Sequence, residues 1–187
     1  MKTAALLYVR NDDYKENERV IVTLSSMLDT FDEVILLDWN TPKGKNPLLW
    51  EIEDKLPKTG RLKHMVIPPN AATQLTNYDP KAQACTQVLS SNIMLRRTDA
   101  DWIVATTIDI IAPKKEILNT FLSNADKNTF YTLSRRDFEI SELEKFGFDK
   151  WKEYRDILDN KSEPRYYPAK VSPNDDYSII NCCGDFQ

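Results

Sequence analysis

The stretch that decides the fold class reads TAALLYVRNDD over residues 3–13 and continues with EVILLD over residues 33–38. Residues 3–9 are apolar without alternation and stop at a polar cluster, which indicates a strand buried on both faces, as in a parallel sheet. Apolar residues within 16–31 recur with a period close to 3.6, which predicts an amphipathic helix. Strand, helix and strand in this order predict a βαβ unit with a right-handed crossover.

The same alternation continues along the chain. It predicts helices and strands in turn, with a short helix over 48–56, a strand over 61–67, a helix over 81–97, a strand over 101–107, a helix from Pro113 to Leu122, a strand over 129–133, a helix over 141–158 and a strand over 177–183. The proline-bearing residues 68–80 and the stretch after Asn160 are expected to form loops. The sequence therefore predicts an α/β domain of three layers, α/β/α, with a mainly parallel sheet.

Composition narrows the class of protein. The 187 residues, 41% of them hydrophobic, suit one domain with a substantial core, and a net charge of −4 argues against nucleic acid as a partner. Three cysteines are too few for a disulfide framework, and no apolar run reaches the ~20 residues of a transmembrane segment. The apolar stretch near the N-terminus is too short for a signal peptide, so we expect a cytoplasmic protein. One histidine and four glycines exclude most histidine-based chemistry and any glycine-rich phosphate loop.

Polar residues follow three of the predicted strands. In an open α/β sheet, ligands bind at the carboxyl ends of the strands, where the strand order reverses. The residues at these ends are Arg10-Asn11-Asp12-Asp13, Asp38-Trp39-Asn40 and Thr106-Thr107-Ile108-Asp109. Their carboxylates, guanidinium, amides and aromatic ring together suit a nucleotide that carries a hydroxylated, anionic group.

Several of these residues have two interpretations. Asp38 can accept hydrogen bonds from a ribose or base edge, or can serve as a turn or cap residue. Trp39 can stack on a ring or simply cover the end of the sheet. Arg10 can pair with a phosphate or form an ion pair with Asp12 or Asp13.

Asp109 stands in the apolar run VATTIDIIAP, where a charge is costly unless it meets a metal, a cation or water. At the end of a strand it can bind a hard cation such as Mg²⁺ or Mn²⁺. On the preceding helix, Asn92 and Arg96, with Arg97, can face a diphosphate. The alternative is an exposed basic helix end stabilised by the helix dipole.

Taken in order, these segments resemble a glycosyltransferase of the GT-A type, close to the family 2-like group. The resemblance runs from residue 3 to the last residue and rests on six family motifs. Val9–Asp13 matches S-R-N-D-D, Asp38–Pro42 matches E-W-N-P-P, and Gln87–Asn92 with Arg96–Thr98 matches Q-x-x-x-K-N-x-G-x-R-R-A. Ala105–Ile110 matches A-T-N-I-D-I, Tyr131–Asp137 matches Y-R-x-D-R-x-D, and Gly184–Phe186 matches G-D-F.

The resemblance implies a GT-A domain that transfers a sugar from a nucleotide-diphosphate sugar to a glycan or other hydroxyl acceptor. A UDP-sugar is favoured and a GDP-sugar is the alternative, with Mn²⁺ or Mg²⁺ as cofactor. Residues 1–110 would form the nucleotide-binding part and residues 111–187 the start of the acceptor part. Asp109 would hold the metal and Asp185 would lie on the acceptor side, while the nucleotide-sugar would contact Val9, Arg10, Asn11, Asp38, Trp39, Asn92, Arg96, Thr107 and Ile108.

The sequence also departs from the family pattern. Thr107 replaces the first acidic position of the D-x-D metal motif (asparagine in the close relatives), Ser91 replaces a lysine, and Met94 a glycine. The G-x-x-E segment that carries the family's catalytic base is expected beyond Gln187, so the domain is expected to be truncated there. These departures motivate an alternative, a catalytically silent module that binds a sugar nucleotide or glycan. A third reading, a phosphoacceptor signalling domain, needs a lysine near the acidic residues that the sequence does not place.

Overall fold

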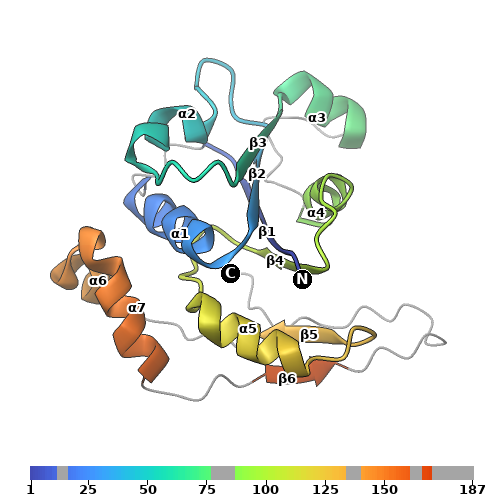
Figure 1. Cartoon of the computed structure of the whole chain (residues 1–187). Coiled ribbons are helices and arrows are strands. Elements are labelled where there is room, and N and C mark those ends of the chain that lie inside the picture. Colours follow the sequence, from blue (N-terminus) through green and yellow to red (C-terminus); the bar gives the residue numbers. More distant parts are fainter. Residues whose placement is uncertain (12–16, 77–86, 134–139, 161–165, 170–187) are drawn as a thin grey trace.

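The computed structural model describes residues 1–11, 17–76, 87–133, 140–160 and 166–169. In this part of the chain, four parallel strands form one sheet in the order β3-β2-β1-β4 (Figure 1). Their bounds are β1 Thr3–Val9, β2 Glu33–Trp39, β3 Leu62–Ile67 and β4 Trp102–Thr106. Strands β5 (Phe130–Leu133) and β6 (Tyr166–Ala169) form a separate antiparallel pair.

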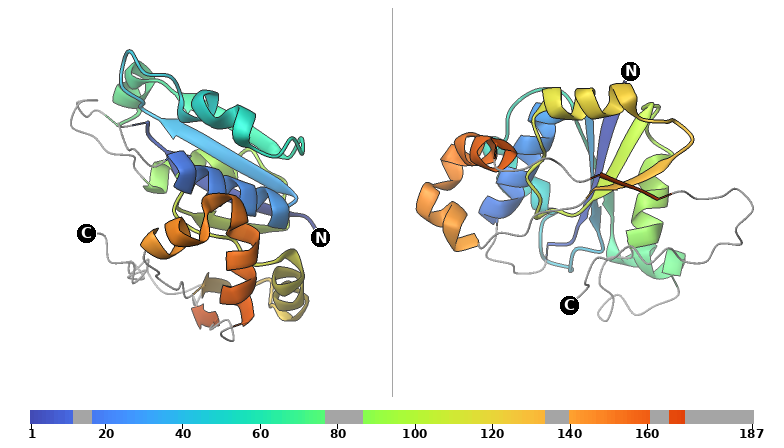
Figure 2. Two further views of the ribbon diagram at one scale, coloured as in Figure 1. Left: turned by 90° about the vertical axis from the view of Figure 1, so that its left-hand side faces the viewer. Right: turned by 90° about the horizontal axis from the view of Figure 1, so that it is seen from below.

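Helices cover both faces of the sheet. One face carries α1 (Asn17–Thr30), α2 (Leu48–Ile52) with a 3-10 turn at Glu53–Lys55, and α5 (Lys115–Asn124). The other carries α3 (Pro69–Thr76) and α4 (Gln87–Leu95) (Figure 2). The chain moves from β1 to β3 in one direction across the sheet and returns to reach β4 beside β1. Right-handed crossovers therefore place the helices that connect β1 to β2 and β2 to β3 on one face, and the helices that connect β3 to β4 on the opposite face. The prediction of an α/β domain with a mainly parallel sheet is confirmed.

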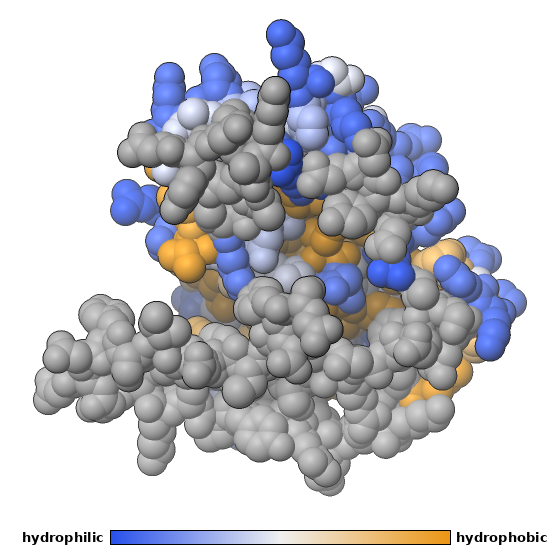
Figure 3. Space-filling view, turned by 180° about the vertical axis from the view of Figure 1, so that it is seen from behind, coloured by the Kyte–Doolittle hydropathy of each residue, from blue (hydrophilic) through white to orange (hydrophobic). Residues whose placement is uncertain are grey.

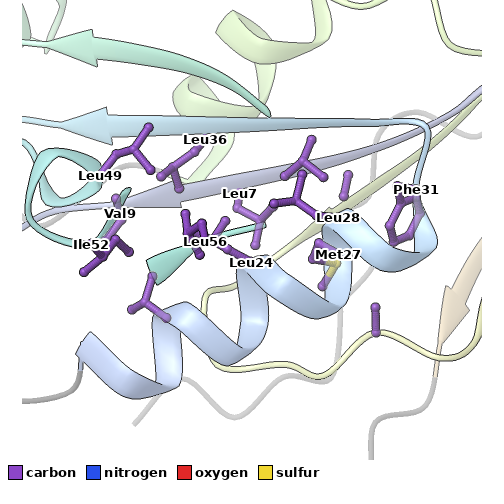
Figure 4. Packing of buried hydrophobic residues seen from close by; sticks show 14 of the residues in the cluster. Leu7, Val9, Leu24, Met27, Leu28, Phe31, Leu36, Leu49, Ile52 and Leu56 are labelled. Atoms are coloured by element: carbon purple, nitrogen blue, oxygen red, sulfur yellow. The ribbon is translucent and has the colours of Figure 1, made fainter. Parts of the chain in front are cut away.

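Strand β1 explains why the first apolar stretch shows no alternation. Leu7 packs into the cluster beneath α1, whereas Leu6 packs into the cluster beneath α3 and α4. Figure 4 shows Leu24 and Leu28 of α1 lying close to Leu7 on the first of these faces. Burying such a leucine contributes roughly 2 kcal/mol, so both layers depend on this central strand.

A smaller helical unit packs on the outside of α1. It consists of α6 (Ile140–Phe146), a 3-10 turn at Phe148–Lys150 and α7 (Trp151–Asn160) (Figure 2). The helix predicted over 141–158 is thus interrupted, at Gly147. This residue has φ +97°, a backbone conformation that residues with a Cβ rarely adopt, so glycine is favoured there.

This helical unit is held to α1 by apolar and charged contacts. Val22 of α1 packs against Leu143, Trp151 and Tyr154. A buried Arg155 donates to Asp29 of α1 at 2.8 Å. The unit therefore belongs to the same packed body as the sheet.

Two predicted loops are wrong in part. Residues 69–76 form α3, which begins at Pro69. Proline is favoured at the first helical position, where its missing N–H costs nothing. Tyr166–Ala169, within the second predicted loop, form β6. The predicted strand over 177–183 lies outside the described residues.

Seen from behind, the upper part of the surface is mainly hydrophilic (Figure 3). Among the described helices, none is long and apolar enough to cross a membrane.

Candidate functional site

A hollow of about 240 Å³ lies at the carboxyl ends of β1 and β4. These strands are neighbours, and Leu7 of β1 pairs with Thr106 of β4. The strand order reverses here, because the chain continues from β1 to β2 and β3 on one side of β1 and then returns to place β4 on its other side. The hollow is lined by residues from both strand ends and from the helices nearby, namely Val9, Arg10, Asn11, Asn17, Arg19, Val20, Leu48, Thr107, Ile108 and Asp109.

Six of these residues are ones that the sequence predicted for the nucleotide-sugar and metal site. They come from two segments far apart in the chain, Val9–Asn11 and Thr107–Asp109. Both segments follow strands that lie side by side in the sheet. The structure therefore brings these two groups together.

The turn after β4 is anchored to α1. The Ile108 carbonyl accepts a hydrogen bond of 2.8 Å from the Thr23 hydroxyl of α1, and the Ile108 side chain packs against the core. The Thr107 hydroxyl donates to the Asp109 carboxylate, which is exposed. A fixed backbone thus presents an accessible carboxylate at the edge of the hollow.

Positive charge lies close to this carboxylate. Arg10 and Arg19 both line the hollow, and so does Asn17, the first residue of α1. The N-terminus of a helix carries partial positive charge and attracts anions, and arginine binds phosphate oxygens in pairs. Among the residues that the structure describes, the lining of the hollow therefore combines one acidic group with surroundings suited to an anion.

Asp38 and Trp39 do not line the hollow and are fully buried. Asp38 accepts hydrogen bonds from the Thr41 hydroxyl and, at 2.7 Å, from the Leu48 N–H. Burial raises the pKa of the Asp38 carboxyl above its usual value, against these hydrogen bonds. Trp39 packs in the core beneath α3 and α4 with Ala72 and Met94. Their direct contact with a nucleoside stays a prediction.

Asn92 is exposed on α4, the helix that covers the opposite face of the sheet from α1, and Arg96 is exposed in the turn that follows this helix. Neither lines the hollow. The neighbouring Arg97, also in this turn, donates to the Ile93 carbonyl of α4 at 3.1 Å. Asp12, Asp13, Arg136, Asp137, Asp185 and Gln187 lie outside the described residues.

The donor groups of the hollow fit a magnesium or manganese ion that shares its ligands with a phosphate. Asp109 offers a carboxylate and Thr107 a hydroxyl. Within the described ranges, no three histidine, cysteine or acidic side chains are grouped to hold a metal. Mg²⁺ commonly takes one or two carboxylates and completes its shell with water and substrate phosphates. A carboxylate beside basic groups suited to a phosphate fits that mode.

Four lining residues were missed by the sequence reasoning, namely Asn17, Arg19, Val20 and Leu48. Three of them belong to the first turn of α1, and Leu48 begins α2. The available signal was the topology itself, because helices that follow parallel strands start at the carboxyl edge of the sheet.

Comparison with known proteins adds little to this geometry. No family model and no curated protein matches the sequence. Among solved structures, the chain is similar to Enterococcus italicus Csm6 bound to cyclic hexa-2'-fluoro-hexa-dAMP, with 10% identity and a TM-score of 0.29. The similarity covers 91% of this chain and 41% of that one. A likeness this weak supports no conclusion on fold or function.

Proposed function

We propose that the chain binds a nucleotide-diphosphate sugar with Mn²⁺ or Mg²⁺ in the hollow between β1 and β4, as part of a GT-A glycosyltransferase. The observation that carries the proposal is the meeting of Val9–Asn11 with Thr107–Asp109. These are two of the segments on which the resemblance to that family rests, and they meet at the edge where parallel sheets bind ligands.

The residues divide the work by their chemistry. Asp109 and Thr107 would hold the metal, which when bound offsets the charge of the leaving diphosphate. Arg10 and Arg19, with the N-terminus of α1, bind phosphate oxygens. The hollow, about 240 Å³, is smaller than the roughly 300 Å³ or more of sites that enclose a whole drug-sized ligand, so it would hold only part of the sugar nucleotide, with the diphosphate beside Asp109. The acceptor is a glycan or another hydroxyl compound.

Isothermal titration with UDP-glucose and with GDP-mannose, in Mn²⁺ and then in EDTA, tests this proposal. We expect saturable binding of one of them that weakens at least tenfold without metal. Asp109→Asn should have the effect of EDTA, whereas Asp54→Asn is a matched control, because Asp54 is an exposed aspartate away from the hollow. Absence of binding to either sugar nucleotide would contradict the proposal.

One observation favours a second candidate, a module that binds the sugar nucleotide without turnover. Asp109 is the sole carboxylate among the described residues that line the hollow, and its neighbour in the motif is a threonine. Release of free nucleotide by a chain extended past Gln187 distinguishes the two. Turnover supports the transferase, and binding without turnover supports the silent module.

A further inference from the structure

We propose that Asp38 and Thr41 are positioning residues, which join two walls of the hollow and hold them in place. The walls are Asn11, after β1, and Leu48, at the start of α2. The consequence for ligand binding rests on the proposed function, whereas the joining of the two walls can be tested without any ligand.

A continuous chain of hydrogen bonds links the two walls. The Asn11 N–H donates to the Thr41 hydroxyl at 3.0 Å. The Thr41 hydroxyl in turn donates to one carboxylate oxygen of Asp38, and the Leu48 N–H donates to the other at 2.7 Å. Both oxygens of Asp38 are therefore engaged, one toward each wall.

Burial increases the cost of breaking these hydrogen bonds, so they fix the positions of the two walls. Asp38 is 0% exposed and Thr41 is 7% exposed. A buried carboxylate is stable only when its oxygens are hydrogen-bonded, so the loss of a partner here is costly. Each wall is thus held by a hydrogen bond whose loss would leave a buried polar group unpaired.

The segment between β2 and α2 is folded back to make this chain of bonds possible. Asn40 has φ +56°, in the left-handed region that asparagine tolerates better than most residues. Its N–H donates to the Ile67 carbonyl of β3 at 2.7 Å. Further along, the Asn46 carbonyl accepts a bond of 2.9 Å from the Asn11 side chain. Asn11 is therefore fastened to this segment by both its backbone and its side chain.

Removal of the Thr41 hydroxyl isolates the contribution of this arrangement. Thr41→Val keeps the shape of the side chain but leaves the Asn11 N–H and one oxygen of Asp38 without a partner in a buried place. Thr41→Ser keeps the hydroxyl. Thr30→Val is the matched control, because Thr30 is also buried and donates to the Pro113 carbonyl at 2.6 Å, outside the residues that line the hollow.

Amide hydrogen exchange, measured residue by residue by NMR without ligand, is the deciding measurement. In Thr41→Val we expect the Asn11 amide to exchange about tenfold faster, with a smaller change at Leu48, which bonds to Asp38 directly. Thr41→Ser should restore protection, and Thr30→Val should leave both amides unchanged. Unaltered protection of Asn11 in Thr41→Val would overturn the proposal.

Titration of the same variants with UDP-glucose and GDP-mannose in Mn²⁺ extends the test to binding. Thr41→Val should weaken binding about five- to tenfold, Thr41→Ser should restore it, and Thr30→Val should leave it unchanged. Loss of Asn11 protection with unchanged affinity would overturn the positioning role. If the unaltered chain binds neither compound, the proposed function fails, and the exchange data alone decide whether Asp38 and Thr41 join the walls.

Discussion

Charged residues stand at both ends of the parallel sheet, but the two ends use them differently. At the carboxyl end, Arg10, Arg19 and Asp109 line a hollow. At the amino end, acidic and basic side chains are paired with one another. The comparison separates charged groups that line a candidate binding site from charged groups that pair with one another and stabilise the fold.

Glu33 shows how charged groups at the amino end are paired. Its side chain is 5% exposed and forms ion pairs with Lys63 and, at 3.3 Å, with Lys2. The Thr98 hydroxyl also donates to it, at 2.8 Å. Burial opposes ionisation, yet these bonds from Lys63, Thr98 and Lys2 hold the pKa of Glu33 below its usual value.

The difference teaches that a polar strand end marks a site only where its groups remain accessible. Asp109 is exposed beside an open volume, whereas Glu33 is buried and surrounded by partners. Substitutions at the two ends should therefore separate into effects on binding and effects on stability.

The largest expected effect is on binding at the carboxyl end. Asp109→Asn removes the carboxylate proposed to hold the metal, and we expect affinity for the sugar nucleotide in Mn²⁺ to fall about 100-fold, or ~2.7 kcal/mol. The thermal midpoint should stay unchanged, because Asp109 is exposed. Calorimetric titration together with a thermal melt checks both statements. An equal loss of stability would place Asp109 with the structural charges instead.

At the amino end, Glu33→Gln should show the reverse pattern. Glutamine keeps the shape but removes the charge that pairs with Lys2 and Lys63, both of which remain near a buried position. We expect a loss of about 2 kcal/mol in the free energy of unfolding, with sugar-nucleotide affinity unaltered. Urea unfolding measures the first quantity and titration the second. Weakened binding in a folded variant would contradict the separation of the two ends.

Much of this architecture follows from the sequence because its signals are local. The unbroken apolar run of residues 3–9 predicts a central strand buried on both faces, which is what β1 is. The rule that ligands bind at carboxyl strand ends then selects Arg10, Asn11, Thr107 and Asp109, and the structure places all four around one hollow.

Other features depend on tertiary geometry that the sequence does not encode locally. Asp38 follows the same rule as Asp109, but it points under the returning segment, because Asn40 adopts a left-handed conformation and Thr41 folds back over it. Asn92 lies on the opposite face, because the chain reverses direction across the sheet before β4. The direction of a side chain at a strand end depends on such reversals.

A smaller effect is expected at Asp32, whose contribution to the stability of the amino end depends on pH. A hydrogen bond from Lys115 lowers the pKa of Asp32 to about 2 from an ordinary 3.8. Partial burial opposes this shift, and two more hydrogen bonds from Thr3 support it. A lowered pKa stabilises the fold fully above the ordinary value and ceases to do so as pH falls toward 2. With 34% of the side chain exposed, solvent screening reduces this contribution to about 1 kcal/mol.

Urea unfolding between pH 5 and pH 2 measures this contribution. Asp32→Asn should lower stability at pH 5 and lose less stability than the unaltered chain as the pH falls. Parallel curves for the two proteins would show that the bonds to Lys115 and Thr3 contribute nothing.

The smallest expected effect is again at the hollow, where Asp109 is the one carboxylate among the described lining residues, and it concerns whether this limits metal binding. Thr107→Asp places a second acidic group beside Asp109, where the Thr107 hydroxyl now donates to that carboxylate. Two adjacent carboxylates repel one another without a cation and share it when one is present. We therefore expect the affinity for Mn²⁺ to rise about threefold and the thermal midpoint without metal to fall slightly. Titration of the ion alone decides this, and an unchanged affinity would mean that Thr107 is not directed at the metal.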